Sequence, residues 1–172
     1  MSKMYYGLTT QQELLGHIRH ACQSLSPNTA SAGYEMLVGT GCTESNLGTY
    51  PDFSEKYGFG WPQFDRVRVK GIAFYIRNRE GLCALILAET GLNVAFYDID
   101  TLCHIIKFSP LIAAFFCRVG YMMVPEPLPK VGDLEAQAFY YKKFWNSYHP
   151  NAKGSVEKYL ADWQEFYAGQ SV

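Results

Sequence analysis

The residues from 41 to 65, GCTESNLGTYPDFSEKYGFGWPQFD, combine a carboxylate with a loop that could line a binding cleft. Glu44 and Ser45 follow a run of small and apolar residues that we predict to be a helix from about residue 31 to about residue 42, so Glu44 lies at or just past a helix C-terminus. Burial raises the pKa of a carboxyl, and the partial negative charge of a helix C-terminus acts in the same direction. Such a carboxyl can hold a proton near neutral pH and donate it to a glycosidic oxygen.

The segment that follows, residues 46–64, contains too many helix-breaking residues to continue the helix. Gly48, Pro51, Gly58, Gly60 and Pro62 all fall within it, and we predict a short β-tongue or a structured loop. The glycines would let the backbone approach a sugar closely. Four aromatic side chains of the same segment offer apolar faces for pyranose rings: Tyr57, Phe59, Trp61 and Phe64.

The order of residues in this stretch resembles the lysozyme superfamily, specifically the branch of soluble lytic transglycosylases and goose-type lysozymes. In that branch a Glu-Ser pair opens the motif, an apolar position and a serine follow, and Gly-Leu-Met-Gln closes it. The matching positions here are Glu44, Ser45, Leu47, Ser54, Gly58 and the closing group Gly60-Trp61-Pro62-Gln63. Two features depart from the family: Trp61-Pro62 replaces Leu-Met, and the later Ala-Tyr-Asn motif has no clear counterpart, so we take Tyr121 in CRVGYMM as its stand-in.

The resemblance implies cleavage of the β-1,4 bond between N-acetylmuramic acid and N-acetylglucosamine in peptidoglycan. Glu44 would be the general acid, and in a transglycosylase the same carboxylate would then act as base while the muramyl 6-hydroxyl closes a 1,6-anhydro ring. The resemblance implies neither a metal nor a cofactor. The residues expected to bind substrate or steady the acid are Ser45, Ser54, Gly60, Trp61, Gln63 and Tyr121.

Two points of this interpretation stay open. A hydrolase would need a second carboxylate to activate water, and Asp52, Glu55 and Asp65 are all near enough in sequence to serve. Trp61 could be a sugar platform, but it could equally be a core residue that anchors the loop.

Composition limits the classes of protein to which the chain can belong. Its 172 residues predict one domain over 1–172, and 48% hydrophobic with 18% charged residues excludes a disordered chain. A net charge of −1 gives no general basic field for nucleic acid. Five cysteines without a Cys-x-x-Cys motif favour reduced thiols over a disulfide framework.

The route to the cell wall is also an expectation from sequence. We find neither an apolar signal segment at the N-terminus nor a convincing membrane span, so we expect synthesis in the cytoplasm and action on the wall. The segment after residue 124 resembles the tail of small phage-encoded proteins with lysozyme-like N-terminal halves. A virion, a membrane pore or a secretion system would then deliver the protein to its peptidoglycan glycan strand.

The remaining pattern predicts a mostly α, lysozyme-like (α+β) fold. A capping box at Thr10–Glu13 opens the first helix. Asp65 can cap a helix over 66–78, although the alternation Val67-Arg68-Val69 leaves a strand open. Further helices are predicted over 80–90, after Asp98 or Asp100, from Pro110 behind Ser109, over 134–149 behind Asp133, and from Ser155 to about residue 168.

Other functions are compatible with single residues of the sequence. A non-catalytic virion structural or wall-binding protein could keep the fold, and a cysteine amidase could use Cys42 if a histidine came close in space. His17 with His20, or Asp98, Asp100 and His104, form only weak metal patterns. Arg118 in an apolar helix is expected to pair with a buried carboxylate, the alternative being that its charged end reaches the surface. The aromatic stripe Tyr140, Tyr141, Trp145 and Tyr148 is expected to be core, with Trp145 or Tyr148 reaching a groove.

Overall fold

Side-chain caps set where most of the helices begin. The computed structural model describes residues 3–51, 58–146 and 155–168, and within them the chain is mostly helical, with no strand. The elements are α1 (Gln11–Leu25), η1 (Pro27–Thr29), α2 (Ala30–Ser45), α3 (Arg66–Arg77), α4 (Glu80–Thr90), α5 (Ile99–Phe108), α6 (Pro110–Met122), α7 (Leu134–Phe144), α8 (Val156–Trp163) and the π-helical turn η2 (Gln164–Ala168).

The predicted caps are confirmed by hydrogen bonds from the first turn of each helix. The Thr10 hydroxyl accepts from the backbone N–H of Glu13 at 3.1 Å, and the Asp65 carboxylate accepts from that of Arg68 at 2.6 Å. The strand alternative for residues 67–69 is therefore wrong. The same role is filled at α5, α6, α7 and α8 by Asp98, Ser109, Asp133 and Ser155.

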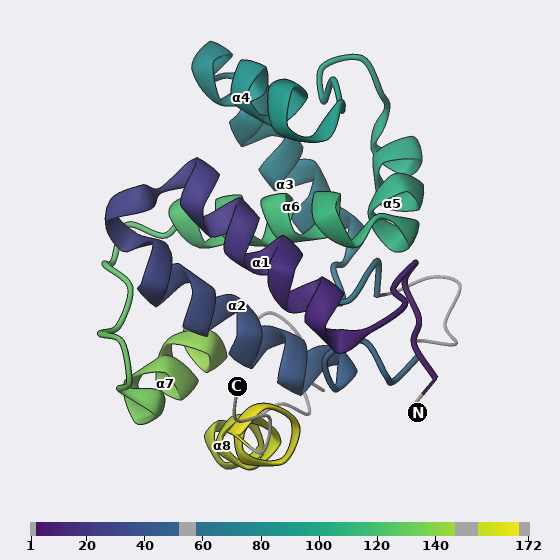
Figure 1. Ribbon diagram of the computed structural model, residues 1–172. Helices are drawn as coiled ribbons and strands as arrows, with labels where there is room; N and C mark the ends of the chain where they lie inside the picture. Colours follow the sequence, from purple (N-terminus) through teal and green to yellow (C-terminus); the bar gives the residue numbers. More distant parts are fainter. Residues whose placement is uncertain (1–2, 52–57, 147–154, 169–172) are drawn as a thin grey trace.

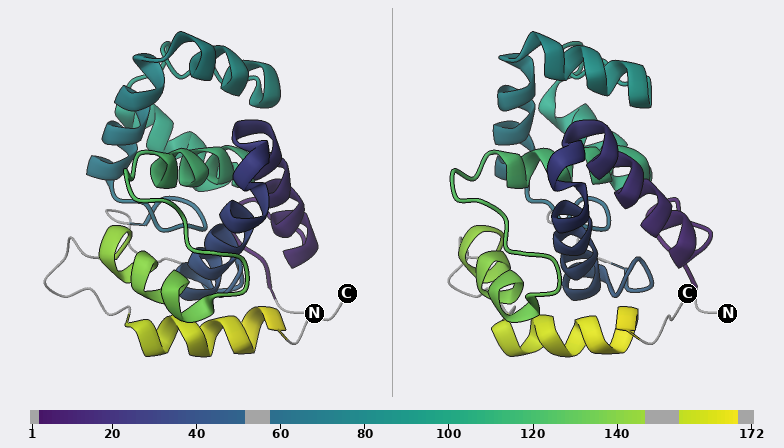
Figure 2. Two further views of the ribbon diagram at one scale, coloured as in Figure 1. Left: turned by 90° about the vertical axis from the view of Figure 1, so that its left-hand side faces the viewer. Right: turned by 60° about the vertical axis from the view of Figure 1, so that its left-hand side comes forward.

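Two groups of helices meet along α6, which is buried over most of its length (Figure 1). The helices α3, α4 and α5 pack on one side of it, while α1 and α2 pack on the other. Helix α8 lies against α2 and α7, as the two turned views in Figure 2 show.

The loop after α2 forms no strand among its described residues. Asn46 and Leu47 adopt left-handed backbone conformations that end the helix, and one isolated antiparallel bridge joins Phe59 to Phe64. The β-tongue predicted over 46–64 is thus reduced to turns and this bridge over 46–51 and 58–64. Ser54, Tyr57, Asp52 and Glu55 lie outside the described residues.

No single helix in the described part of the chain is long and apolar enough to cross a membrane. Helices α5 and α6 reach the length and apolar composition of a membrane span only when taken together, and the chain bends by 117° between them.

Candidate active site

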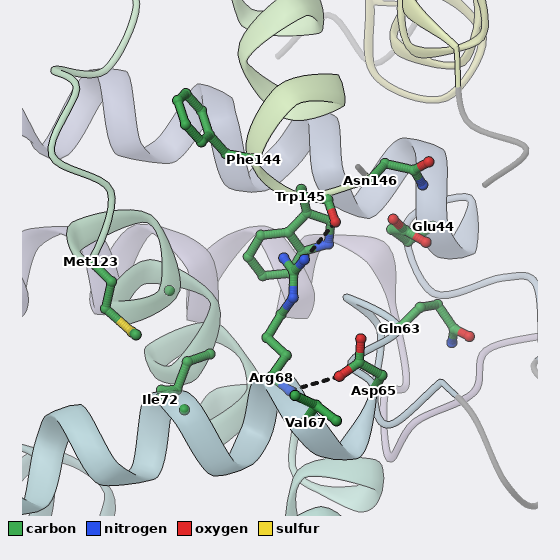
Figure 3. Close-up of a pocket in the computed structure, with 12 residues that line it drawn as sticks. Glu44, Gln63, Asp65, Val67, Arg68, Ile72, Met123, Phe144, Trp145 and Asn146 are labelled. Atoms are coloured by element: carbon green, nitrogen blue, oxygen red, sulfur yellow. Dashed lines mark hydrogen bonds between the residues drawn. The ribbon is translucent and has the colours of Figure 1, made fainter. Parts of the chain in front are cut away.

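A pocket of about 660 Å³ lies where the C-terminal ends of α2 and α7 face the first turns of α3 (Figure 3). Its polar end holds Glu44, Gln63, Asp65 and Asn146. Ile72, Met123 and Phe144 form an apolar end, while Val67 lies beside Asp65 (Figure 3). Gly71 and Gly120 also line the pocket. Arg68 and Trp145 lie between the two ends.

Glu44 lies in the last turn of α2, which runs three residues beyond the predicted end of the helix. Its side chain is partly buried, and this burial raises the pKa of its carboxyl from 4.5 to about 7. Hydrogen bonds from Tyr141 and Asn146 and the charges of Arg68 and Lys158 act in the opposite direction. Burial prevails, so the carboxyl is half protonated near neutral pH.

Tyr141 is the direct partner of the Glu44 carboxyl, and sequence reasoning missed it. Its hydroxyl donates to Glu44 Oε1 at 2.5 Å and accepts from Asn146 Nδ2 at 3.1 Å. This chain of bonds fixes the orientation of the carboxyl from α7, 97 residues further along the sequence. The aromatic stripe on α7 was the only signal in the sequence, and it favoured a core role for Tyr141.

Tyr121, the predicted stand-in for the family tyrosine, does not reach the pocket. It is 2% exposed, and its hydroxyl shares a 2.7 Å hydrogen bond with that of Thr40. Its ring stacks on Trp145, with centroids 4.9 Å apart. Tyr121 therefore supports the floor beneath Trp145, and the prediction that it binds substrate is corrected to this packing role.

Gln63, which we expect to bind substrate or steady the acid, lines the pocket in a left-handed conformation with φ 53°. Its side-chain amide donates to the Tyr6 hydroxyl at 2.8 Å and to the Gly60 carbonyl at 3.0 Å. Ser45 and Gly60 do not line the pocket. Ser45 bonds the Gly41 carbonyl and the Gly48 N–H within the turn, and a side chain on Gly60 would lie 2.7 Å from the carbonyl oxygen of Ile106. Both shape the loop that holds Gln63.

Trp61 is a core residue. It has no exposed surface, and its indole N–H donates to the Pro110 carbonyl at 3.2 Å, which ties the loop to the start of α6. The prediction that Trp61 offers a face to a sugar is wrong, because every face of the ring is covered. Trp145 is the indole that lines the pocket.

Asp65 is the one described residue among the three candidates for a second carboxylate. It is exposed, lines the same pocket as Glu44 and caps α3 through one carboxylate oxygen. Figure 3 shows its carboxylate on the Glu44 side of Arg68.

The weaker chemical patterns in the sequence find little support. Cys42 is fully buried, and that burial raises the pKa of its thiol well above the ordinary value, which removes it as a nucleophile. No group of three His, Cys, Asp or Glu side chains in the described residues could hold a metal ion. Arg118 is buried and donates to the Thr29 hydroxyl at 3.0 Å; within the described ranges it makes no salt bridge, so the expected carboxylate pair is absent there.

No protein-family model, curated protein or solved structure matches the chain.

Proposed function

We propose that the protein cleaves the glycan strand of peptidoglycan at the β-1,4 bond between N-acetylmuramic acid and N-acetylglucosamine, with Glu44 as general acid. The observation that carries the proposal is a carboxyl with a pKa raised to about 7 at the polar end of an open pocket. A general acid works best when its pKa lies near the working pH. Structural carboxylates rarely have this property, because a carboxylate that only stabilises a fold is usually ionised at neutral pH.

In the first step the Glu44 carboxyl gives its proton to the glycosidic oxygen, and the bond from that oxygen to the muramyl C1 breaks. Tyr141 keeps the carboxyl oriented by donating to Oε1. Gln63, with its backbone fixed by the turn and its amide held by Tyr6 and Gly60, borders the same space and would contact the sugar beside the bond.

Two acceptors can complete the reaction. In a transglycosylase the Glu44 carboxylate takes the proton of the muramyl 6-hydroxyl as that oxygen attacks C1, which yields a 1,6-anhydro sugar and restores the acid. In a hydrolase water attacks C1, and Asp65 in the same pocket is the described carboxylate available to assist it.

Mass spectrometry of purified peptidoglycan after digestion tests the proposal. We expect the wild-type protein to release muropeptides with anhydro or reducing ends, whichever acceptor operates, and Glu44→Gln to release none. Glu135→Gln is a matched control, since Glu135 is exposed in the first turn of α7. New amino groups without new sugar ends would indicate an amidase and overturn the proposal. If binding occurs without any product, the protein is a non-catalytic wall binder.

A further inference from the structure

Arg68 is a cation in the pocket whose charge lowers the pKa of Glu44, but the general-acid mechanism assigns it no contact with the substrate. Its guanidinium lies over the Trp145 ring, 4.3 Å from the centroid, and one amino group donates to the Trp145 carbonyl at 2.6 Å. These contacts hold the planar group in one orientation. In the part of the chain that the structure describes, Arg68 makes no salt bridge, although Asp65 and Glu44 line the same pocket.

A guanidinium has five N–H donors arranged as a fork that matches a carboxylate. Stacking on Trp145 uses the face of the group, and the Trp145 carbonyl uses one amino group. The remaining edge is available to an anion entering the pocket. The pocket is open around it, since Arg68 is only partly buried and borders both the polar and the apolar ends.

The apolar end lies beside this cation. Ile72, Met123 and Phe144 supply its walls, and Figure 3 shows them on the side of Arg68 away from Glu44. At Gly71 a side chain would meet no atom within 4 Å, so the space over this part of α3 is open. An unbranched chain of N-acetylglucosamine carries no charge, so it has no anionic group that could pair with a fixed cation beside an apolar wall.

We propose that Arg68 and the apolar wall formed by Ile72, Met123 and Phe144 recognise the 3-O-lactyl branch of muramic acid, with Arg68 binding a carboxylate carried on that branch. This inference rests on the proposed glycan substrate. The lactyl group combines a methyl group with a carboxyl and is attached to the sugar whose C1 is cut. In glycan from which the stem peptides have been removed, the carboxylate is that of the lactyl group itself. In peptide-bearing glycan the lactyl carboxyl is part of an amide bond, and the carboxylate belongs to the stem peptide.

Binding of soluble glycan fragments to the Glu44→Gln protein, measured by calorimetry, tests the inference without turnover. The probes are a muramyl tetrasaccharide with free lactyl carboxylates, the same fragment with those groups converted to primary amides, a peptide-bearing fragment with and without amidation, and a chitin tetrasaccharide. We expect each carboxylate form that Arg68 recognises to bind about tenfold or more tighter than its amide, as for a hydrogen bond between charged groups. The stripped and peptide-bearing pairs show which carboxylate is bound.

Two further substitutions on the Glu44→Gln background separate recognition from folding. Arg68→Met should abolish the difference between carboxylate and amide, while Arg68→Lys should retain part of it. Gly71→Leu should weaken all muramyl fragments by filling the open space, whereas Gly81→Leu, at another open glycine on α4, should not.

The inference would be overturned if the carboxylate and amide forms of each fragment bound with equal affinity, or if the preference for the carboxylate survived Arg68→Met. It would also be overturned if no muramyl fragment bound. Failure of the proposed function gives a different result. In that case wild-type protein releases no products, whether or not the carboxylate preference is found.

Discussion

At the scale of single residues, Glu44 is the group on which the account depends. Burial raises the pKa of its carboxyl and the hydrogen bond from Tyr141 lowers it, so the two effects act against each other. The balance leaves a proton on the carboxyl near neutral pH, where a general acid needs it. An ionised carboxylate in this place also lowers the stability of the folded protein. The raised pKa of Glu44 can therefore be detected in the free energy of unfolding, without any substrate.

Glu44→Gln should stabilise the protein at high pH. The folded-state pKa of Glu44 is raised to about 7 from 4.5, so the native state binds more protons than the unfolded state between these values and wild-type stability falls as pH rises through them. Glutamine removes this loss. We expect the free energy of unfolding of the variant to exceed that of wild type by about 1 to 3 kcal/mol at pH 8 and to match it near pH 4.

Urea unfolding of both proteins at the two pH values measures this difference. Glu135→Gln, which removes an exposed carboxylate, should show no comparable gain at pH 8. An equal offset between wild type and Glu44→Gln at both pH values would contradict a raised pKa.

Tyr141→Phe should shift the pH dependence of glycan cleavage to higher pH. The Tyr141 hydrogen bond lowers the pKa of Glu44, so its removal lets burial raise that pKa further. Tyr140→Phe is the matched control, because the neighbouring hydroxyl bonds the Glu126 carbonyl and does not contact Glu44. The comparison needs rate measurements from pH 5 to pH 9, and a common shift in both variants would exclude a specific role for Tyr141.

Part of this site could be predicted from sequence. Glu44 and Gln63 belong to a local pattern, and both line the pocket. Tyr141 and Arg68 could not be assigned, because their roles depend on contacts between segments about 97 and 77 residues apart. For Trp61 the sequence motif predicted a contact with the substrate, whereas the side chain is buried. Its burial results from the packing of the loop on α6, which is distant in the sequence.

At the scale of elements, the starts of helices were predictable and their ends were less so. Caps such as Asp65 and Ser155 act within one turn, so the sequence contains the whole interaction. Helix α2 extends to Ser45 without a local signal, and α7 ends at Phe144, short of the predicted residue 149. The mostly helical class follows from the helical periodicity, whereas the glycines and prolines of residues 46–64 excluded a helix there without distinguishing a β-tongue from a structured loop.

Gly39→Ala should displace α8 from α2. The Tyr159 ring of α8 lies directly on Gly39, and an added Cβ would lie 1.8 Å from the tyrosine oxygen. We expect a loss of about 1 to 3 kcal/mol in the free energy of unfolding, as for an overpacked core. Gly16→Ala on α1 is the control: a methyl group there meets no atom within 4 Å, so it should stabilise the helix by about 0.5 to 1 kcal/mol. Denaturant unfolding of both variants provides the comparison, and equal effects would argue against the close approach.

At the scale of the whole molecule, the two groups of helices that meet along α6 make both a closed core and an open pocket. Each of the helices α1 to α8 contributes buried residues to the core. The pocket forms where the ends of α2 and α7 do not reach α3. The protection of the interior can be measured through the cysteines.

Alkylation by iodoacetamide should distinguish Cys83 from the other cysteines. All five are free, and Cys83 is the partly exposed one. Burial raises the pKa of Cys22 to about 12 and that of Cys103 to about 11, and it also raises the pKa values of Cys42 and Cys117 well above the ordinary value. Intact mass at pH 8 should show one rapid adduct in native protein and five in denaturant. Rapid native labelling of Cys42 would reopen the cysteine-hydrolase alternative.

The most direct test of the central claim is the rate of glycan cleavage by the wild-type protein as a function of pH, measured as kcat/KM. If Glu44 donates the proton, the rate should fall as pH rises through about 7, because only the protonated carboxyl is competent. Above that pH the decline should approach about tenfold per pH unit. A rate that is flat or rises through pH 7, or the absence of any cleavage, would contradict the assignment of Glu44 as the general acid.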